Sequence, residues 1–242
     1  AFRPLVPGTK FIHYNLVSDL KKITKNTAAV ILETIQGGAG FIVPKDGYLK
    51  KVKQRCEEVG ALLIVDEIQT GIGRTGKFWG FEHFKIIPDI IISGKGLGGG
   101  MPIGAFIAQK NLMDVLKEHP TLGHITTFGG HPVIASAGVA TVNTIQNSTL
   151  IEDTLEKEQL IRSLLKHPLI KEIRGKGLML AALVESPEIA AKIIHRCLAN
   201  GLILFFLLFE GRAIRITPPL TISKKEISKG CKILLEILDE LS

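Results

Sequence analysis

The first half of the chain alternates short apolar runs with longer segments in which apolar and charged residues are mixed. This pattern predicts one helix, at Gly47–Val59, and four strands, at Ala28–Leu32, Ala61–Val65, Ile90–Ser93 and Ile103–Ala108. Short apolar strands that alternate with amphipathic helices are typical of a mostly parallel sheet buried on both faces. We therefore expect the α/β fold class.

A long apolar stripe then predicts a helix over Pro132–Ile145, and the polar run Asn147-Ser148-Thr149 interrupts the pattern after it. The remaining residues predict helices at Leu150–Leu165, Pro187–Ala199 and Lys224–Leu241, and strands at Ile170–Arg174, Gly177–Leu183, Ile203–Phe209 and Ile214–Ile216. We expect Ser148 or Thr149 to cap the first of these helices. Ser223 and Glu226 form a capping-box pattern at the start of the last one. The break divides the chain into residues 1–147 and a smaller α+β unit, residues 148–242.

The longest apolar stretch, Leu202 to Phe209, is too short to cross a bilayer, and we expect it to be a buried strand rather than a membrane segment. Cys56, Cys197 and Cys231 are widely spaced and form no C-x-x-C pair, so neither a disulfide framework nor a metal site is indicated. A reducing compartment, the cytoplasm, fits this best. The first residues, from Ala1, have neither an initiator Met nor an apolar leader, and we expect them to continue a longer sequence.

The balance of 30 basic against 23 acidic residues gives a formal net charge of +7, which could suit an anionic partner such as nucleic acid or a phosphorylated cofactor. The lysines are spread along the chain in runs no longer than a pair, with little aromatic residue between them. A solvated surface explains such a distribution, so we expect no nucleic-acid partner.

An acidic residue, Asp66, follows the apolar run Leu63–Val65 in the segment L-I-V-D-E-I-Q-T-G at 63–71. Open α/β sheets place their ligands at the carboxyl ends of their strands, so Asp66 is a candidate site residue. An aspartate that caps the following turn is the alternative. The same alternative applies to Gln69.

A lysine, Lys95, follows the apolar run Ile90–Ile92 and precedes several glycines in D-I-I-I-S-G-K-G-L-G-G-G at 89–100. Burial at a strand end would lower the pKa of its ammonium group, and a lysine in that setting suits Schiff-base chemistry. A nucleotide-binding P-loop is disfavoured because its lysine comes after the glycines, beside Ser or Thr. A surface lysine in a glycine turn remains the other alternative.

Two further segments contain candidate binding residues. H-I-T-T-F-G-G at 124–130, which includes Thr127, offers hydroxyls and backbone amides just before a predicted helix, a plausible anion site or simply a helix cap. Arg215 lies between Ile214 and Ile216 on a predicted strand, so its side chain points away from theirs. It is either exposed or a planar partner for a substrate carboxylate.

Taken together, these segments resemble the class III (omega-type) aminotransferases, the group of acetylornithine, ornithine and 4-aminobutyrate aminotransferases. The matching stretches are L-E-T-I-Q-G-G-A-G at 32–40, D-E-I-Q-T-G-I-G-R-T-G at 66–76, P-D-I-I-I-S-G-K-G-L-G-G-G-M-P-I-G-A at 88–105, T-T-F-G-G-H-P at 126–132, R-G-K-G-L at 174–178 and R-I-T-P-P-L at 215–220. The resemblance covers essentially the whole chain. It implies the aspartate aminotransferase-like fold (fold type I) of transferases that depend on pyridoxal 5'-phosphate (PLP). Residues 1–147 would be the C-terminal part of the large domain with its connecting helix.

The resemblance also implies a role for each matching residue. Lys95 resembles the lysine that holds PLP as a Schiff base and moves the proton, and Asp66 the aspartate that keeps the pyridine nitrogen protonated. Gln69 matches the residue near the phenolic oxygen, and Ile68 the apolar contact under the ring. Thr127 corresponds to a threonine that reaches the phosphate in the neighbouring subunit.

Arg215 lines up with the arginine that binds a substrate carboxylate, while Glu33 and Gln36 would have supporting roles beside the site. The resemblance thus implies a cytoplasmic homodimer with shared active sites, which moves an amino group from an amino acid or amine to a 2-oxo acid such as 2-oxoglutarate. An aminomutase, a decarboxylase on the same fold and a non-catalytic fragment are the alternatives.

The chain departs from the family pattern at two points. The family motif usually reads E-P-I-Q-G-E-G-G or close to it, and its second glutamate can pair with the substrate arginine. Gly38 stands at that position here, so we expect Arg215 to be constantly available. In addition, the Gly-Thr-rich phosphate loop and the stacking aromatic residue that family members have ahead of the segment matching Ala1 are not in this sequence.

Overall fold

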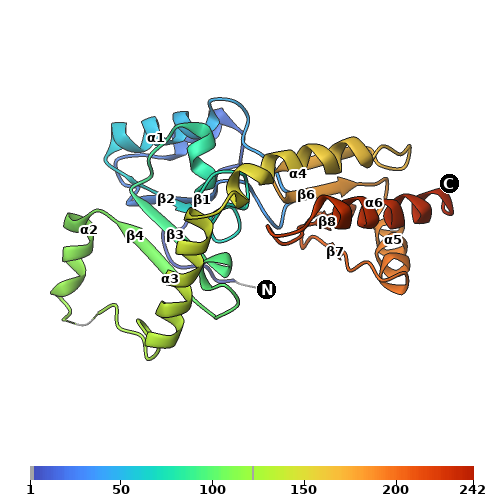
Figure 1. Cartoon of the computed structure of the whole chain (residues 1–242). Coiled ribbons are helices and arrows are strands. Elements are labelled where there is room, and N and C mark those ends of the chain that lie inside the picture. The colour runs from blue at the N-terminus through green and yellow to red at the C-terminus, as the bar shows by residue number, and fades with distance from the viewer. Residues whose placement is uncertain (1–2, 122) are drawn as a thin grey trace.

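The chain forms two four-stranded sheets, each covered by helices, in a computed structural model that describes residues 3–121 and 123–242. Figure 1 shows the first sheet with α1 on one side of the molecule and the second sheet with α4, α5 and α6 on the other. Helix α3 (Pro132–Gln146) packs against the segment after β3, and α4 (Leu150–Leu164) follows it on the side of the second sheet. The predicted α/β fold class is confirmed.

The first sheet has the order β1-β2-β3-β4. Its strands are β1 (Ala29–Glu33), β2 (Leu62–Asp66), β3 (Ile90–Gly94) and β4 (Gly104–Ala108). The first three run parallel and β4 is antiparallel to β3, so the sheet is mostly parallel, as expected. Three parallel neighbours bring the carboxyl ends of β1, β2 and β3 to the same edge.

Helix α1 (Tyr48–Val59) covers one face of the first sheet. Its buried residues Leu49, Val52 and Cys56 pack in one cluster with Leu63 and Val65 of β2. An ion pair at the surface supports this packing, because Asp89 accepts from Lys53 Nζ at 2.9 Å and from the backbone N–H of Leu63 at 2.7 Å.

The second sheet is antiparallel, with the order β5-β6-β8-β7. Its strands are β5 (Glu172–Lys176), β6 (Met179–Leu183), β7 (Phe205–Phe206) and β8 (Ala213–Ile216). Helices α4, α5 (Pro187–Ala199) and α6 (Lys224–Asp239) pack against it around a core that includes Leu180, Ile193 and Leu238.

One of the two helix caps predicted from the sequence is present. The Ser223–Glu226 capping box at the start of α6 is present, and Ser186 caps α5 by accepting from the backbone N–H of Ile189. Thr149 holds the N-cap position of α4 but makes no side-chain cap, because its hydroxyl instead donates to Asp153 Oδ2.

A third apolar cluster joins the two sheets. Ile35 and Phe41, from the segment after β1, pack with Met179 and Ala181 of β6 and with Leu207. The remaining elements are α2 (Lys110–Asp114) and the 3-10 helices η1 (Val17–Lys22), η2 (Gly80–Phe84), η3 (Lys95–Gly98) and η4 (Val115–Lys117). The boundary at Asn147 falls between α3 and α4, and the division into two domains there stays a prediction.

The predicted buried strand at Ile203–Phe209 is wrong. Only Phe205 and Phe206 are in a strand, and both are more than half exposed, at 58% and 61%. Leu208 and Phe209 are exposed further, whereas Leu207 is buried in the third cluster. The run lies at the edge of the second sheet, where no described element covers its outer side. Among the described residues, no helix is long and apolar enough to cross a membrane.

Candidate active site

Lys95 lies where β3 ends and η3 begins, at the sheet edge that the carboxyl ends of β1 and β2 share. Its backbone is left-handed, with a φ of 42°, a conformation that is costly for any residue but glycine. The pKa of the Lys95 ammonium is below its usual value, first because the group is partly removed from water and then because of the positive charge of Arg215. Asp66 and Glu33 act in the opposite direction. The direction agrees with the expectation, but the Lys95 side chain is exposed rather than buried, so its removal from water is only partial.

One cavity, of about 820 Å³, brings four of the predicted residues together. Lys95 lines it with Ile68 and Gln69, which follow β2, and with Arg215 from β8 of the second sheet. Arg215 donates from Nε to Thr217 Oγ1 at 3.0 Å. The arginine is therefore half-buried beside the lysine rather than on the outer surface. A cavity with a primary amine and a guanidinium group suits a substrate that presents a carbonyl or amine and a carboxylate.

Asp66, Glu33 and Gln36 line a second, smaller cavity of about 320 Å³. Asp66 and Glu33 are register partners at the ends of β2 and β1. Asp66 Oδ1 accepts from the backbone N–H of Ile68 at 2.9 Å, which fixes the carboxylate at the turn after the strand. The pKa of Glu33 is raised by burial, although Glu33 Oε2 accepts from the backbone N–H of Gly37 at 2.7 Å.

Gly37 connects the two cavities, because side chains from both lie against it. A Cβ on Gly37 would be 2.6 Å from Gln69 Nε2 and 3.0 Å from Glu33 Oε2. Such a contact has no room for a side chain, so glycine lets Gln69 and Glu33 approach from opposite walls. The two cavities therefore adjoin at one group of polar side chains.

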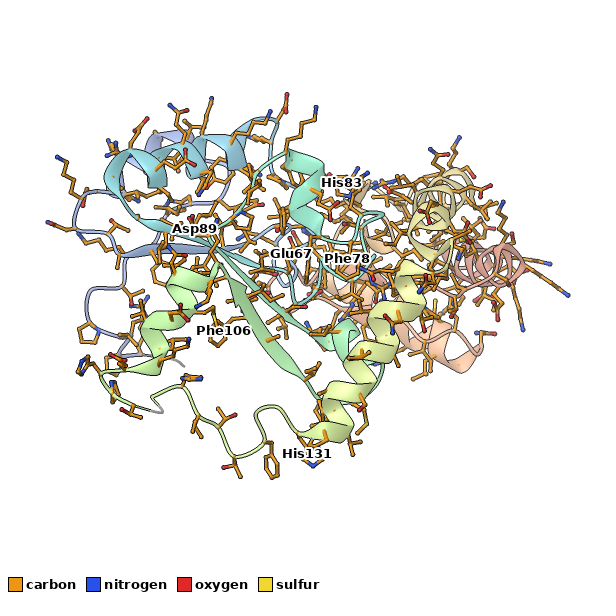
Figure 2. The ribbon with its side chains drawn as sticks, turned by 60° about the vertical axis from the view of Figure 1, so that its left-hand side comes forward. Glu67, Phe78, His83, Asp89, Phe106 and His131 are labelled. Carbon is orange, nitrogen blue, oxygen red and sulfur yellow. The ribbon has the colours of Figure 1, made fainter. Side chains whose placement is uncertain are left out.

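Thr127 is not part of either cavity. It is exposed, in the segment 123–131 that precedes α3 and extends away from the rest of the molecule (Figure 1). His131, the N-cap of α3, is at the far end of this helix in Figure 2. The structure thus brings seven of the eight predicted residues together and leaves Thr127 apart.

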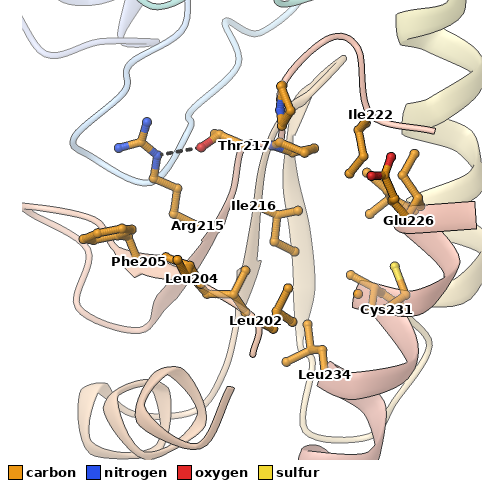
Figure 3. A pocket seen from close by; sticks show the side chains of 17 residues that line it. Leu202, Leu204, Phe205, Arg215, Ile216, Thr217, Ile222, Glu226, Cys231 and Leu234 are labelled. Atoms are coloured by element: carbon orange, nitrogen blue, oxygen red, sulfur yellow. Dashed lines mark hydrogen bonds between the residues drawn. The ribbon is translucent and has the colours of Figure 1, made fainter. Parts of the chain in front are cut away.

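A third cavity, of about 510 Å³, lies between the second sheet and α6, and its walls are mostly apolar. Figure 3 shows Leu202, Leu204 and Leu234 inside it, with Arg215 at its rim. The Arg215 guanidinium group points away from these leucines and toward Thr217. Arg215 thus separates an apolar space from the cavity that contains Lys95.

Sequence reasoning missed two charged residues next to the site, the half-buried Arg74 and the buried Glu67. Arg74 donates from one nitrogen to the carbonyl of Pro218 at 2.6 Å and to that of Leu178 at 3.2 Å, which ties the turn after β2 to the second sheet. Burial and the charge of Arg215 lower the pKa of Arg74. Glu67 is fully buried beside Asp66. Both residues lie in the matched stretch D-E-I-Q-T-G-I-G-R-T-G at 66–76, which was the available signal for them.

Comparison with known protein families identifies a match to the model described as aminotransferase class-III over residues 8–238. That range covers nearly all of the chain. The chain belongs to the class-III aminotransferase family. The predicted resemblance is confirmed, and with it the fold of PLP-dependent transferases, which the similar solved structures share.

Relatives and structures of this family agree along the whole chain. A putrescine aminotransferase of Pectobacterium atrosepticum is 39% identical over 100% of this chain and 54% of its own length. An acetylornithine aminotransferase of Caldanaerobacter subterraneus is 38% identical over 99% of this chain and 61% of its own length. The ornithine aminotransferase of Toxoplasma gondii superposes with a TM-score of 0.91 at 35% identity, over 99% of this chain and 57% of that one. This class-III aminotransferase chain therefore spans little more than half the length of the relatives it matches.

Proposed function

We propose that this chain carries the catalytic residues of a PLP-dependent aminotransferase. It would move an amino group from an acetylornithine-, ornithine- or 4-aminobutyrate-like donor to a 2-oxo acid such as 2-oxoglutarate. The observation that carries the proposal is the placement of the Lys95 amine, with its lowered pKa, in one cavity with Arg215. Family membership and the names of the relatives point to the same chemistry.

The residues around Lys95 fit pyridoxal phosphate by the chemistry of their side chains. Lys95 offers a primary amine for a Schiff base, and Asp66 offers a carboxylate oxygen, Oδ2, that no described residue bonds. Ile68 offers an apolar surface and Gln69 an amide beside the same cavity. When bound, the cofactor supplies an electron sink for negative charge on the substrate carbon.

Each residue then has one task. Lys95 attaches the cofactor and afterwards carries a proton on Nζ to and from the substrate, and Asp66 keeps the ring nitrogen protonated through a charged hydrogen bond. Gln69 would lie near the phenolic oxygen of the cofactor, and Ile68 would offer an apolar contact to its ring. Arg215 binds a substrate carboxylate through its planar fork.

Supporting roles fall to the residues around this set. Glu33 and Gln36 line the neighbouring cavity and hold the loop beside the site. Thr127 would act in a homodimer, in which its exposed segment reaches the cofactor phosphate of the other subunit. The free thiols of Cys56, Cys197 and Cys231 are all buried, which agrees with a reducing compartment such as the cytoplasm.

The experiment is a trapping assay followed by a transfer assay. The protein is incubated with pyridoxal phosphate and borohydride, digested, and examined by mass spectrometry for the cofactor on the peptide containing Lys95. Amino transfer from each candidate donor to 2-oxoglutarate is then measured. A product that has lost carbon dioxide, or no label on Lys95, would overturn the aminotransferase assignment.

A further inference from the structure

Glu67 is a carboxylate completely removed from solvent next to the candidate site. Figure 2 shows it inside the molecule, beneath the segment that carries Phe78 and His83. Its Oε2 accepts from the backbone N–H of Gly80 at 2.7 Å, and its Oε1 accepts from the backbone N–H of Phe81 at 3.0 Å and from the Thr34 hydroxyl. A buried carboxylate without such donors would cost several kcal/mol.

These three bonds join three separate segments of the chain. Thr34 directly follows Glu33 at the end of β1, and Glu67 directly follows Asp66 at the end of β2. Gly80 and Phe81 begin η2, which packs over the turn after β2. The residue after Glu33 is thus bonded to the residue after Asp66. This links the backbone next to the two candidate carboxylates inside the core.

The surroundings of Glu67 leave little freedom for that arrangement. A Cβ on Gly80 would lie 2.8 Å from Thr70 Cβ and 3.2 Å from Glu67 Oε2, so the backbone approaches the carboxylate as closely as glycine allows. The Glu67 backbone is held as well, since its N–H donates to Ile92 on β3 at 2.8 Å and its carbonyl accepts from Gly71 at 2.9 Å. Both ends of the residue are therefore fixed.

We propose that Glu67 is a positioning residue for the cofactor site: through its bond to Thr34 it sets the Asp66 and Glu33 carboxylates relative to Lys95. This proposal rests on the proposed function. A displacement of one ångström in a catalytic group is costly, so supports of this kind decide how well a site works. Glu67 itself lines neither cavity that contains the candidate residues and touches the cofactor in no step.

At position 34 the chain also departs from the usual family motif E-P-I-Q-G-E-G-G. The family motif has proline where this chain has Thr34, and proline has no side-chain donor. The hydroxyl of Thr34 therefore gives Glu67 a third hydrogen bond that a sequence following the motif could not supply. The proposal can therefore be tested by removing the Thr34 hydroxyl group alone.

The experiment compares Thr34→Val, Thr34→Ser and Glu67→Gln with the wild type. Three quantities are measured: the Kd for pyridoxal phosphate by absorbance titration, the position of the bound absorbance band over pH, and the melting midpoint without cofactor. We expect Thr34→Val to weaken binding about tenfold, because the two carboxylates would no longer be held in place relative to Lys95; a displacement of a full ångström can cost about a hundredfold. Glu67→Gln should weaken binding at least as much, and both should move the pH dependence of the band. Thr34→Ser, which restores the hydroxyl, should bind as the wild type does.

Thr154→Val is the matched control, because it also removes a buried hydroxyl, one that donates to the Leu150 carbonyl at 2.7 Å within α4. It should lower the melting midpoint and leave the Kd and the band unchanged. If Thr34→Val behaves like this control, the role of Glu67 is only structural and the proposal is overturned; Thr34→Val decides the matter even if Glu67→Gln does not fold. If the wild type itself shows no borohydride-stable cofactor on Lys95, the proposed function fails, and this proposal fails with it.

Discussion

The central strands of the two sheets are buried in different ways. All five residues of β6 in the second sheet are buried, because helices cover one face and the third cluster covers the other. In β2 of the first sheet only Leu63 and Val65 are buried, and Asp66 on the opposite face is partly open. The second sheet is therefore packed on both faces, and the first sheet mainly on the face that α1 covers.

The candidate residues follow this difference. Glu33 and Asp66 are register partners on the face of the first sheet that α1 does not cover, and Ile31, on the same face, is 64% exposed. Arg215 is contributed by the second sheet at the point where that sheet meets the first cavity. The two candidate carboxylates thus lie on the more open face of the first sheet, and the more fully packed second sheet contributes the candidate Arg215. Four sets of substitutions test this division of roles.

Loss of the Lys95 amine should have the largest effect. Lys95→Ala removes both the covalent anchor and the proton carrier, and we expect a loss of amino transfer worth about 5 kcal/mol or more of barrier. Amino transfer to 2-oxoglutarate at saturating donor measures it. Lys110→Ala, at an exposed lysine in α2, is the control and should retain activity. Turnover of Lys95→Ala near the wild-type rate would contradict the assignment of Lys95.

Truncation of one side chain in each sheet tests whether the two sheets differ in how tightly they are packed. Leu180→Ala in β6 should reduce the free energy of unfolding by about 3 kcal/mol, because the side chain is fully buried and leaves a cavity. Ile31→Ala on the open face should cost less than about 1 kcal/mol. Urea denaturation measures both. Similar losses would show that the open face is packed as tightly as the second sheet.

Removal of the Arg215 charge should change the pKa of the Lys95 amine, although the Lys95 side chain itself is unaltered. Arg215 lowers the pKa of Lys95, so Arg215→Gln should raise that pKa. The amine then becomes neutral only at higher pH, and the pH profile of borohydride-trapped cofactor should shift upward. Arg212→Gln, at an arginine that pairs with Glu210 instead, is the control and should leave the profile in place. An identical profile for both variants would place Arg215 too far from Lys95 for its role.

The smallest effect is expected at Gly38. Gly38→Glu introduces a carboxylate that can compete with the substrate carboxylate for Arg215. Because such a pair would be partly solvated, 2-oxo acid binding should weaken by only roughly threefold. Gly38→Gln controls for size, since a Cβ at this position would lie 3.1 Å from Phe209 Cδ2 and either side chain must displace that ring. Equal affinities for Gly38→Glu and Gly38→Gln would show that Arg215 and position 38 are not neighbours.

Much of the fold could be predicted because local signals and tertiary packing agree. The helix at Gly47–Val59 differs from α1 by one residue, since Gly47 and Gly60 adopt left-handed conformations at its two ends. The strands before Asp66 and Lys95 were placed within a residue or two, because apolar runs end where glycine or charge begins. The ends of parallel strands then define the edge where ligand residues meet.

The errors have a common physical cause. Hydrophobicity alone predicts that Leu202–Phe209 is buried, but burial depends on whether another element covers the residue, and none of the described ones covers Phe205 or Phe206. Glu67 was missed for the converse reason. A glutamate after a strand is normally solvated, and its burial follows from donors as distant in sequence as Thr34 and Phe81. The residues around Thr127 likewise give no information about where this segment would lie relative to another subunit.

The left-handed backbone of Lys95 has an evolutionary consequence. A lysine at a φ of 42° pays about 1–2 kcal/mol that glycine at the same position would not. The proposed catalytic role of Lys95 and the stability of the backbone therefore favour different residues at position 95. A library randomised at position 95 and screened only for survival at high temperature should therefore accumulate glycine.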